Sequence, residues 1–107
     1  MRVAYADGVF EELVSLSFYI AEADEDAAQR FLDACDETFR FLAENRFVGS
    51  IRKFNNPNLS EVRMWRISGY EKYLVFYHPL TDGVKILHVI HSARDYNQVF
   101  EDENPKE

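Results

Sequence analysis

Residues 62–91 read VRMWRISGYEKYLVFYHPLTDGVKILHVIH, and this stretch decides the fold. It holds three apolar runs, at residues 62–67, 73–78 and 84–90, separated by turn-forming residues around Gly69 and Gly83. The apolar pattern has a period near two, which is the period of a β-strand. Consecutive strands joined by short turns pair as an antiparallel meander. The last two runs are apolar at nearly every position, so both faces of the sheet are expected to be at least partly covered.

Upstream of this stretch, apolar residues recur every three or four positions, which predicts two amphipathic helices. The first is expected over about residues 8–23, after a short strand at residues 3–5, with Asp7 as its N-cap. The second is expected to begin at Asp24 and to end near Asn45. The expected buried stripe of the first helix is Phe10, Leu13, Leu16, Ser17 and Ile20, broadened by Val9, Val14 and Phe18. That of the second is Ala28, Phe31, Cys35, Thr38, Phe39 and Leu42. Because the connection is so short, the two helices must form an antiparallel hairpin.

A chain of 107 residues suits one compact domain, residues 1–107. We therefore expect an α+β fold with a short N-terminal strand and a helix hairpin packed on a three- to four-stranded antiparallel sheet. A short C-terminal helix is expected at residues 95–100. The hairpin covers one face of the sheet, and no second cover is apparent in the sequence. An apolar surface that a partner covers is the resulting hypothesis.

Charge is distributed unevenly along the chain, whose net charge is −7. Residues 1–45 carry three basic and eleven acidic side chains, residues 46–94 eight and three, and residues 95–107 one and five. The acidic total argues against direct nucleic-acid binding, because phosphate contacts need clustered cations. The basic middle predicts a face that meets an anionic partner, although cations on the wet face of a sheet would give the same composition.

Metal and cofactor sites are not expected. Cys35 is the only cysteine, so no internal disulfide and no cysteine-based zinc site can form. His88 and His91 are an odd number of residues apart, which places them on opposite faces of an extended strand and makes them poor co-ligands. The chain begins with no signal-peptide pattern and holds no apolar stretch of the ~20 residues that span a bilayer. We expect a cytoplasmic protein with no membrane partner.

Three segments of the chain carry a resemblance to a known family. They are Phe18-Tyr19-Ile20 with Ala28, Phe31 and Leu42, then Tyr73-Leu74-Val75-Phe76-Tyr77 followed by Asp82-Gly83, and finally Ile86-Leu87-His88-Val89-Ile90-His91-Ser92-Ala93-Arg94-Asp95. Together with Arg52 after Gly49, and Val62-Arg63, they cover nearly the whole chain. This order resembles the RelE/ParE superfamily of bacterial type II toxins, and most closely its ParE branch.

The resemblance implies a toxin with two protein partners. One is a cognate ParD-like antitoxin with a ribbon-helix-helix N-terminus, whose flexible apolar-acidic C-terminal segment wraps the toxin and folds as it binds. The other is DNA gyrase, which the free toxin would poison by contact, blocking replication and arresting growth. On this interpretation the toxin has no catalytic residue and needs no cofactor or metal.

Eight residues are the candidates for partner binding, to antitoxin or gyrase. They are Arg52, Arg63, Trp65, Arg66, Tyr73, His91, Arg94 and Asp95. Strand alternation puts Arg63 on one face with Trp65 and Ile67, and Arg66 on the other with Val62 and Met64, so they cannot all line one patch. Structural roles compete with binding: Arg94 could pair with a carboxylate or cap the sheet, and Asp95 could cap the tail helix.

Two alternative functions remain open. RelE-type toxins cut messenger RNA on the ribosome, and such chemistry needs a base, an acid and cations converging on one phosphate. His91 and Tyr96 could be parts of such a site, with Arg63 or Arg66 stabilising charge. The acidic total argues against this function. The second alternative is a non-toxic binding subunit of a stable heteromer.

Overall fold

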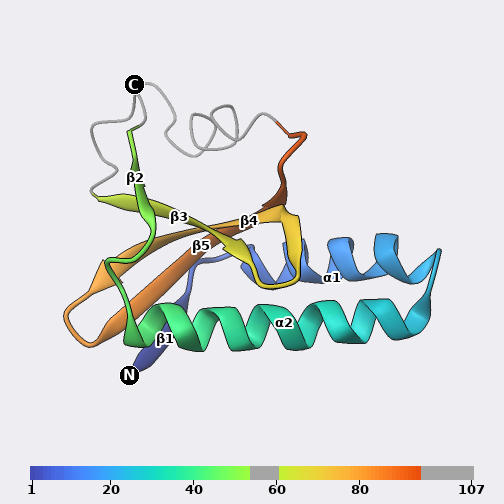
Figure 1. Cartoon of the computed structure of the whole chain (residues 1–107), viewed down its shortest axis with the longest axis horizontal. Helices are drawn as coiled ribbons and strands as arrows, with labels where there is room; N and C mark the ends of the chain where they lie inside the picture. Colours follow the sequence, from blue (N-terminus) through green and yellow to red (C-terminus); the bar gives the residue numbers. More distant parts are fainter. Residues whose placement is uncertain (54–60, 95–107) are drawn as a thin grey trace.

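The computed structural model describes residues 1–53 and 61–94. In chain order the elements are β1 (Arg2–Tyr5), α1 (Val9–Ala21), α2 (Glu25–Glu44), β2 (Ser50–Arg52), β3 (Val62–Ile67), β4 (Tyr70–Leu80) and β5 (Gly83–His91). The strands form one sheet in the order β1-β5-β4-β3-β2. Figure 1 shows α1 and α2 lying side by side beneath this sheet. The expected α+β class, the helix hairpin and the meander are confirmed.

The sheet is wider than the sequence predicted. It has five strands, because the three residues of β2 add an edge strand antiparallel to β3. The N-terminal strand β1 pairs parallel with β5, with Arg2 opposite Gly83 and Tyr5 opposite Ile86. The sequence could not predict β2, because three residues are too few to show a period of two. It could not predict the parallel partner of β1 either, because that pairing depends on how the helix hairpin brings the chain back to the sheet.

The two helix starts have different chemistry. Asp24 caps α2 as expected, because its carboxylate accepts hydrogen bonds from the backbone N–H groups of Asp26 and Ala27. The expectation for Asp7 is wrong: the N-cap of α1 is Gly8, and no side chain caps it. Gly8 has φ +92, a left-handed conformation that lets the chain turn from β1 into α1 and that other residues adopt at a cost.

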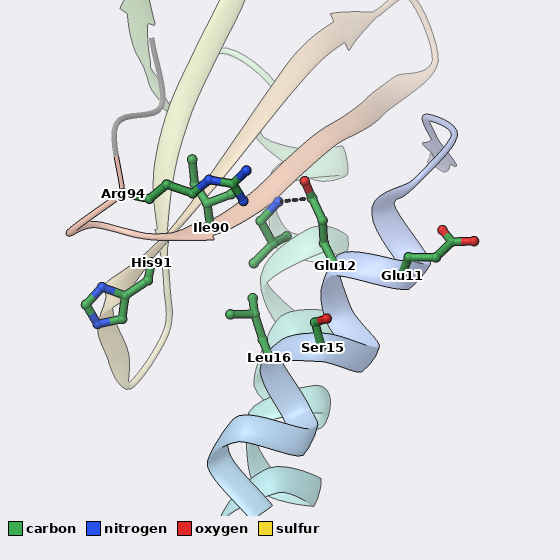
Figure 2. Close-up of a pocket in the computed structure, with 8 residues that line it drawn as sticks. Glu11, Glu12, Ser15, Leu16, Ile90, His91 and Arg94 are labelled. Atoms are coloured by element: carbon green, nitrogen blue, oxygen red, sulfur yellow. Dashed lines mark hydrogen bonds between the residues drawn. The ribbon is translucent and has the colours of Figure 1, made fainter. Parts of the chain in front are cut away.

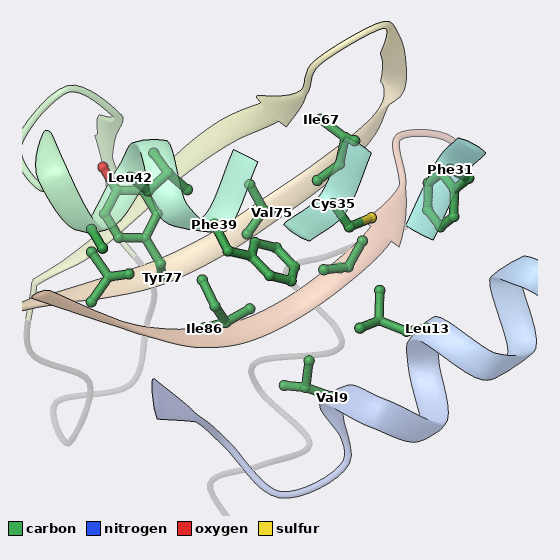
Figure 3. Packing of buried hydrophobic residues seen from close by; sticks show 13 residues of the cluster. Val9, Leu13, Phe31, Cys35, Phe39, Leu42, Ile67, Val75, Tyr77 and Ile86 are labelled. Atoms are coloured by element: carbon green, nitrogen blue, oxygen red, sulfur yellow. The ribbon is translucent and has the colours of Figure 1, made fainter. Parts of the chain in front are cut away.

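The main core lies between the helix hairpin and the sheet. Figure 3 shows Phe39 and Leu42 of α2 packed over Val75 and Tyr77 of β4. The predicted stripe of α2 is buried throughout. The predicted stripe of α1 is partly wrong. Val9 and Leu13 are buried, whereas Phe10, Val14 and Phe18 are exposed.

The opposite face of the sheet carries a second buried cluster. It consists of Val62, Met64, Leu74, Phe76 and Ile90. These side chains are at most 8% exposed, so the hypothesis that this face is an open apolar surface is wrong. The large apolar side chains that the described residues do expose lie elsewhere, at Met1, on α1, and between the end of α2 and β2. The sequence showed that both faces of the sheet are apolar but not that both are buried. The expected C-terminal helix lies outside the described residues.

Candidate protein-interaction site

Exposed apolar side chains gather where the end of α2 meets β2 and β3. Phe47 and Ile51 are more than half exposed, and Phe41 stacks on Trp65 with ring centroids 6.0 Å apart. The guanidinium groups of Arg46 and Arg63 lie 4.8 and 5.3 Å from the centre of the Phe47 ring. We call this the corner surface; its members are Phe41, Arg46, Phe47, Val48, Ile51, Arg63 and Trp65. Cations beside exposed rings make it suited to an apolar and acidic partner.

Arg63 holds the backbone beneath this surface. Its Nη1 donates to the backbone carbonyls of Phe47 and Gly49, at 2.9 and 2.7 Å, and its Nε donates to the carboxylate of Glu61. The Arg63 side chain is only 15% exposed. Its donors therefore fix the segment that presents Phe47 and Val48, and little of the guanidinium faces solvent.

Buried Tyr77 supports the same segment from inside. Its hydroxyl accepts a hydrogen bond of 2.9 Å from the backbone N–H of Gly49. An added Cβ at Gly49 would lie 2.6 Å from that hydroxyl, so the close approach requires glycine. Burial raises the pKa of Tyr77, and the Gly49 hydrogen bond and the Arg63 charge lower it by less. Tyr77 is therefore a neutral hydroxyl that anchors the corner surface to the core.

Arg66 lies on the opposite side of the sheet from Arg63, as strand alternation predicted, and Arg52 lies on the same side as Arg66. Arg52 pairs with Val62, which belongs to the second buried cluster. The Nε of Arg52 is buried and has no hydrogen-bond partner in the structure as described. Arg66 donates through Nη1 to the backbone carbonyl of Glu71 at 2.7 Å. Arg66 is exposed, so its guanidinium faces solvent, whereas the Nε of Arg52 is shielded from a partner.

The end of β5 brings three further candidates together. The rings of Tyr73 and His91 meet edge to face with centroids 5.1 Å apart. The Nδ1 of His91 accepts a hydrogen bond from the backbone N–H of Ala93 at 3.0 Å. Arg94 and His91 line a cavity of about 320 Å³ between α1 and β5, and Figure 2 shows the Arg94 side chain reaching across Ile90 toward Glu12. Asp95 lies outside the described residues.

Sequence reasoning missed Glu12. Its carboxylate accepts the backbone N–H of Val89 at 3.0 Å and contacts Nδ1 of His88, which is 7% exposed. Since β1 ends opposite Ile86, Glu12 occupies the edge of β5 that β1 leaves unpaired. A signal was present, because Glu12 stands four residues before Leu16 and so falls beside the buried stripe.

The candidate residues do not converge on one point. Arg63 lies opposite Tyr77 on β4, whereas His91 lies opposite Tyr73. Four residues along a strand separate the two positions by about 13 Å. Within residues 1–53 and 61–94 no cluster of metal-binding side chains occurs. The corner surface and the end of β5 are therefore two separate regions.

A helix hairpin on one face of a mostly antiparallel sheet, with β1 at the edge beside the last strand, is the architecture of the RelE/ParE superfamily. Residues 3–96 match the family described as the ParE toxin of the type II toxin-antitoxin system, parDE. The chain therefore belongs to the ParE toxin family and is a toxin of the type II class, which implies an antitoxin partner. A search of curated proteins finds no significant match. Among the described residues, no helix is long and apolar enough to cross a membrane.

Proposed function

We propose that this toxin is neutralised by a ParD-like antitoxin with a ribbon-helix-helix N-terminus and that, when free, it poisons DNA gyrase by binding it. The observation that carries the proposal is the corner surface, where exposed rings and arginines lie at the edge of the sheet. In this proposal the toxin acts in the cytoplasm, arrests growth when the antitoxin is lost, and thereby maintains the plasmid or chromosome that encodes the pair.

The antitoxin contact follows from charge and exposure. Among the described residues β2 is the last strand of the sheet, and an extended segment can add to its outer edge through main-chain hydrogen bonds. Its apolar side chains would pack on Phe47 and Ile51, and a carboxylate on the other side of the segment would meet the half-buried side chain of Arg52. A flexible acidic segment that orders on this surface matches the expected antitoxin C-terminus.

Binding rather than catalysis is supported by what the polar candidates already do. Arg63 and Arg66 donate to backbone carbonyls, and His91 accepts from the backbone. Strand register keeps Arg63 and His91 apart. A ribonuclease would need its base, acid and cations around one phosphate. Gyrase is the target that membership of the ParE family suggests.

The antitoxin contact is tested by exchanging exposed rings. We expect Phe47→Ser to weaken binding of the cognate antitoxin by about tenfold or more, because interface aromatics carry much of the binding energy. Phe18→Ser, at a ring on α1 that is 69% exposed against 57% for Phe47, is the matched control and should bind normally. Equal affinities for wild type and Phe47→Ser would contradict the placement of the antitoxin.

The target is tested with purified gyrase and supercoiled plasmid. Free toxin should trap a cleaved plasmid product, and antitoxin added in excess should suppress it. In cells, induction without antitoxin should cause filamentation and an SOS response. Arg63→Ala and Arg94→Ala should weaken toxicity in a graded way. Prompt loss of intact messenger RNA, or complete loss of toxicity in folded His91→Ala, would favour the ribonuclease instead.

A further inference from the structure

The outer side of α1 carries an exposed apolar stripe that the proposed function does not use. Phe10, Val14 and Phe18 are 58%, 52% and 69% exposed. They recur every fourth residue, so they form one line along two turns of helix, about 12 Å long. We call these three residues the α1 stripe. Val9 and Leu13 of the same helix point into the core (Figure 3). A different side of α1 therefore faces the core, and the α1 stripe faces solvent.

The surroundings of the α1 stripe are acidic. No lysine or arginine occurs between Arg2 and Arg30, whereas seven aspartates and glutamates do. Glu11 and Glu22 follow the stripe residues on the same helix. On the α2 side, Tyr5 contacts Phe10 with ring centroids 4.8 Å apart, and the charge of Asp36, after burial, raises the pKa of Tyr5. Asp36 forms an ion pair with Arg40 at 2.6 Å, so the acidic charge beside the stripe comes mainly from α1 and its two ends.

A cavity adjoins this surface at the tip of the hairpin. It has a volume of about 460 Å³ and is lined by Tyr19, Ile20, Glu22, Ala23, Asp24 and Ala27. Tyr19 is 68% exposed, so the apolar surface continues from α1 to the mouth of the cavity. Asp24 caps α2 and lies 3.6 Å from Arg30, so Glu22 is the carboxylate of this cavity that suits the charged head of a lysine or arginine, whose aliphatic stem would lie on the apolar walls.

We propose that the α1 stripe is a docking site for a basic amphipathic helix of a partner protein. Apolar residues of that helix at four-residue spacing would pack on Phe10, Val14 and Phe18, and its cations would meet the flanking carboxylates. The antitoxin segment of the proposed function is acidic and suits the basic corner surface, so the two partners differ in charge. A second copy of this chain is disfavoured as the occupant, because its own α1 would bring like charges together.

The test uses the full-length chain and a designed helical peptide, 18 residues long, with leucines along one stripe and lysines on its flanks. Fluorescence anisotropy at low and physiological salt measures its affinity. One control peptide has glutamate at every lysine position, and another has the lysine composition in scrambled order. We expect both controls to bind at least about tenfold more weakly. We expect Phe18→Ser to weaken binding of the lysine peptide by a similar factor, while Phe47→Ser leaves it unchanged.

Four outcomes would overturn the proposal. They are equal binding of the lysine and scrambled peptides, unchanged binding to Phe18→Ser, displacement of the peptide by cognate antitoxin, and a dimer that Phe18→Ser dissociates. The last result would make a second copy the occupant. Melting curves show whether Phe18→Ser stays folded, and Val14→Ser is a second variant of the same stripe. Antitoxin affinity is measured in parallel, so a failure here is distinguishable from a failure of the antitoxin assignment.

Discussion

Tyr77→Phe removes one oxygen atom from the centre of the protein and should destabilise it measurably. The Tyr77 side chain is fully buried, and its hydroxyl accepts the backbone N–H of Gly49 at 2.9 Å. Phenylalanine fills nearly the same volume, so the change creates almost no cavity. Its main effect is to leave the Gly49 N–H without that acceptor. A buried donor that loses its partner costs about 1–3 kcal/mol of folding free energy.

The expected shift in melting temperature follows from the size of the chain. An unfolding entropy of ~2.1 cal/mol/K per residue gives roughly 0.22 kcal/mol/K for 107 residues. Each kcal/mol then lowers Tm by about 4–5 °C, so the variant should melt about 4–14 °C below wild type. Differential scanning calorimetry at neutral pH gives this shift, and urea denaturation gives the free energy directly. Tyr19→Phe, at an exposed tyrosine, is the control and should melt like wild type.

Tyr77→Phe should also change how the stability of the protein depends on pH in the alkaline range. Burial raises the pKa of Tyr77 above its value in the unfolded chain, so the unfolded state loses this proton first as the pH rises. The stability that Tyr77 contributes is thus present below the unfolded pKa and declines above it. Wild type should lose part of its advantage over Tyr77→Phe above about pH 10. A variant that melts within a degree of the Tyr19→Phe control would refute the role assigned to the Gly49 hydrogen bond.

Three further predictions concern other parts of the fold. Glu12→Ala should lower the free energy of unfolding, measured by urea denaturation, by about 1–3 kcal/mol, because the N–H of Val89 loses its acceptor. Glu12→Gln keeps a side-chain oxygen and should lose less. Equal losses in the two variants would contradict this role of Glu12. Arg2 lowers the pKa of Asp82, chiefly by hydrogen bonding, so the pair stabilises the protein above the unfolded pKa of Asp82 and ceases to do so as the pH falls through the folded pKa. The melting temperature should therefore fall less between pH 7 and pH 3 in Asp82→Asn than in wild type. Equal falls in the two proteins would contradict the stabilising role of the pair. Burial raises the pKa of Cys35 to about 12, so a disulfide reagent at pH 8 should label the thiol only after denaturant is added, and rapid native labelling would contradict its burial.

The sequence predicted best where the pattern is periodic over many residues. The α2 stripe and β3 are found where the sequence placed them, because one face of each element must be buried and the polar residues leave only one choice. In α1 the pattern left two choices. Phe10, Val14 and Phe18 are as apolar as Val9 and Leu13, so hydrophobicity alone could not say which side meets the sheet. The left-handed turn at Gly8 precedes the helix and sets how it enters the fold.

The sequence predicted on which face of the sheet a candidate residue lies, but not which residues the fold brings into contact. Strand alternation correctly separated Arg63 from Arg66, since a strand has a fixed period of two. The partners of these arginines are backbone carbonyls of segments that the sequence cannot place in space. The contact between Glu12 and His88 joins residues 76 positions apart, which only the packing of α1 against β5 brings together. The corner surface likewise needed β2, a strand too short to predict.

Arg63 shows why a cationic residue at an interface need not be a contact residue. Its Nη1 donates to the carbonyls of Phe47 and Gly49, and the N–H of Gly49 donates to Tyr77. The guanidinium and the phenol therefore hold the same short segment, the first through its carbonyls and the second through an N–H group. Loss of either would free the backbone that carries Phe47, so a partner that packs on this ring would lose affinity even if it never touched Arg63. The effect of Arg63→Ala on antitoxin binding should accordingly be reproduced in kind by Tyr77→Phe, whose side chain no partner can reach.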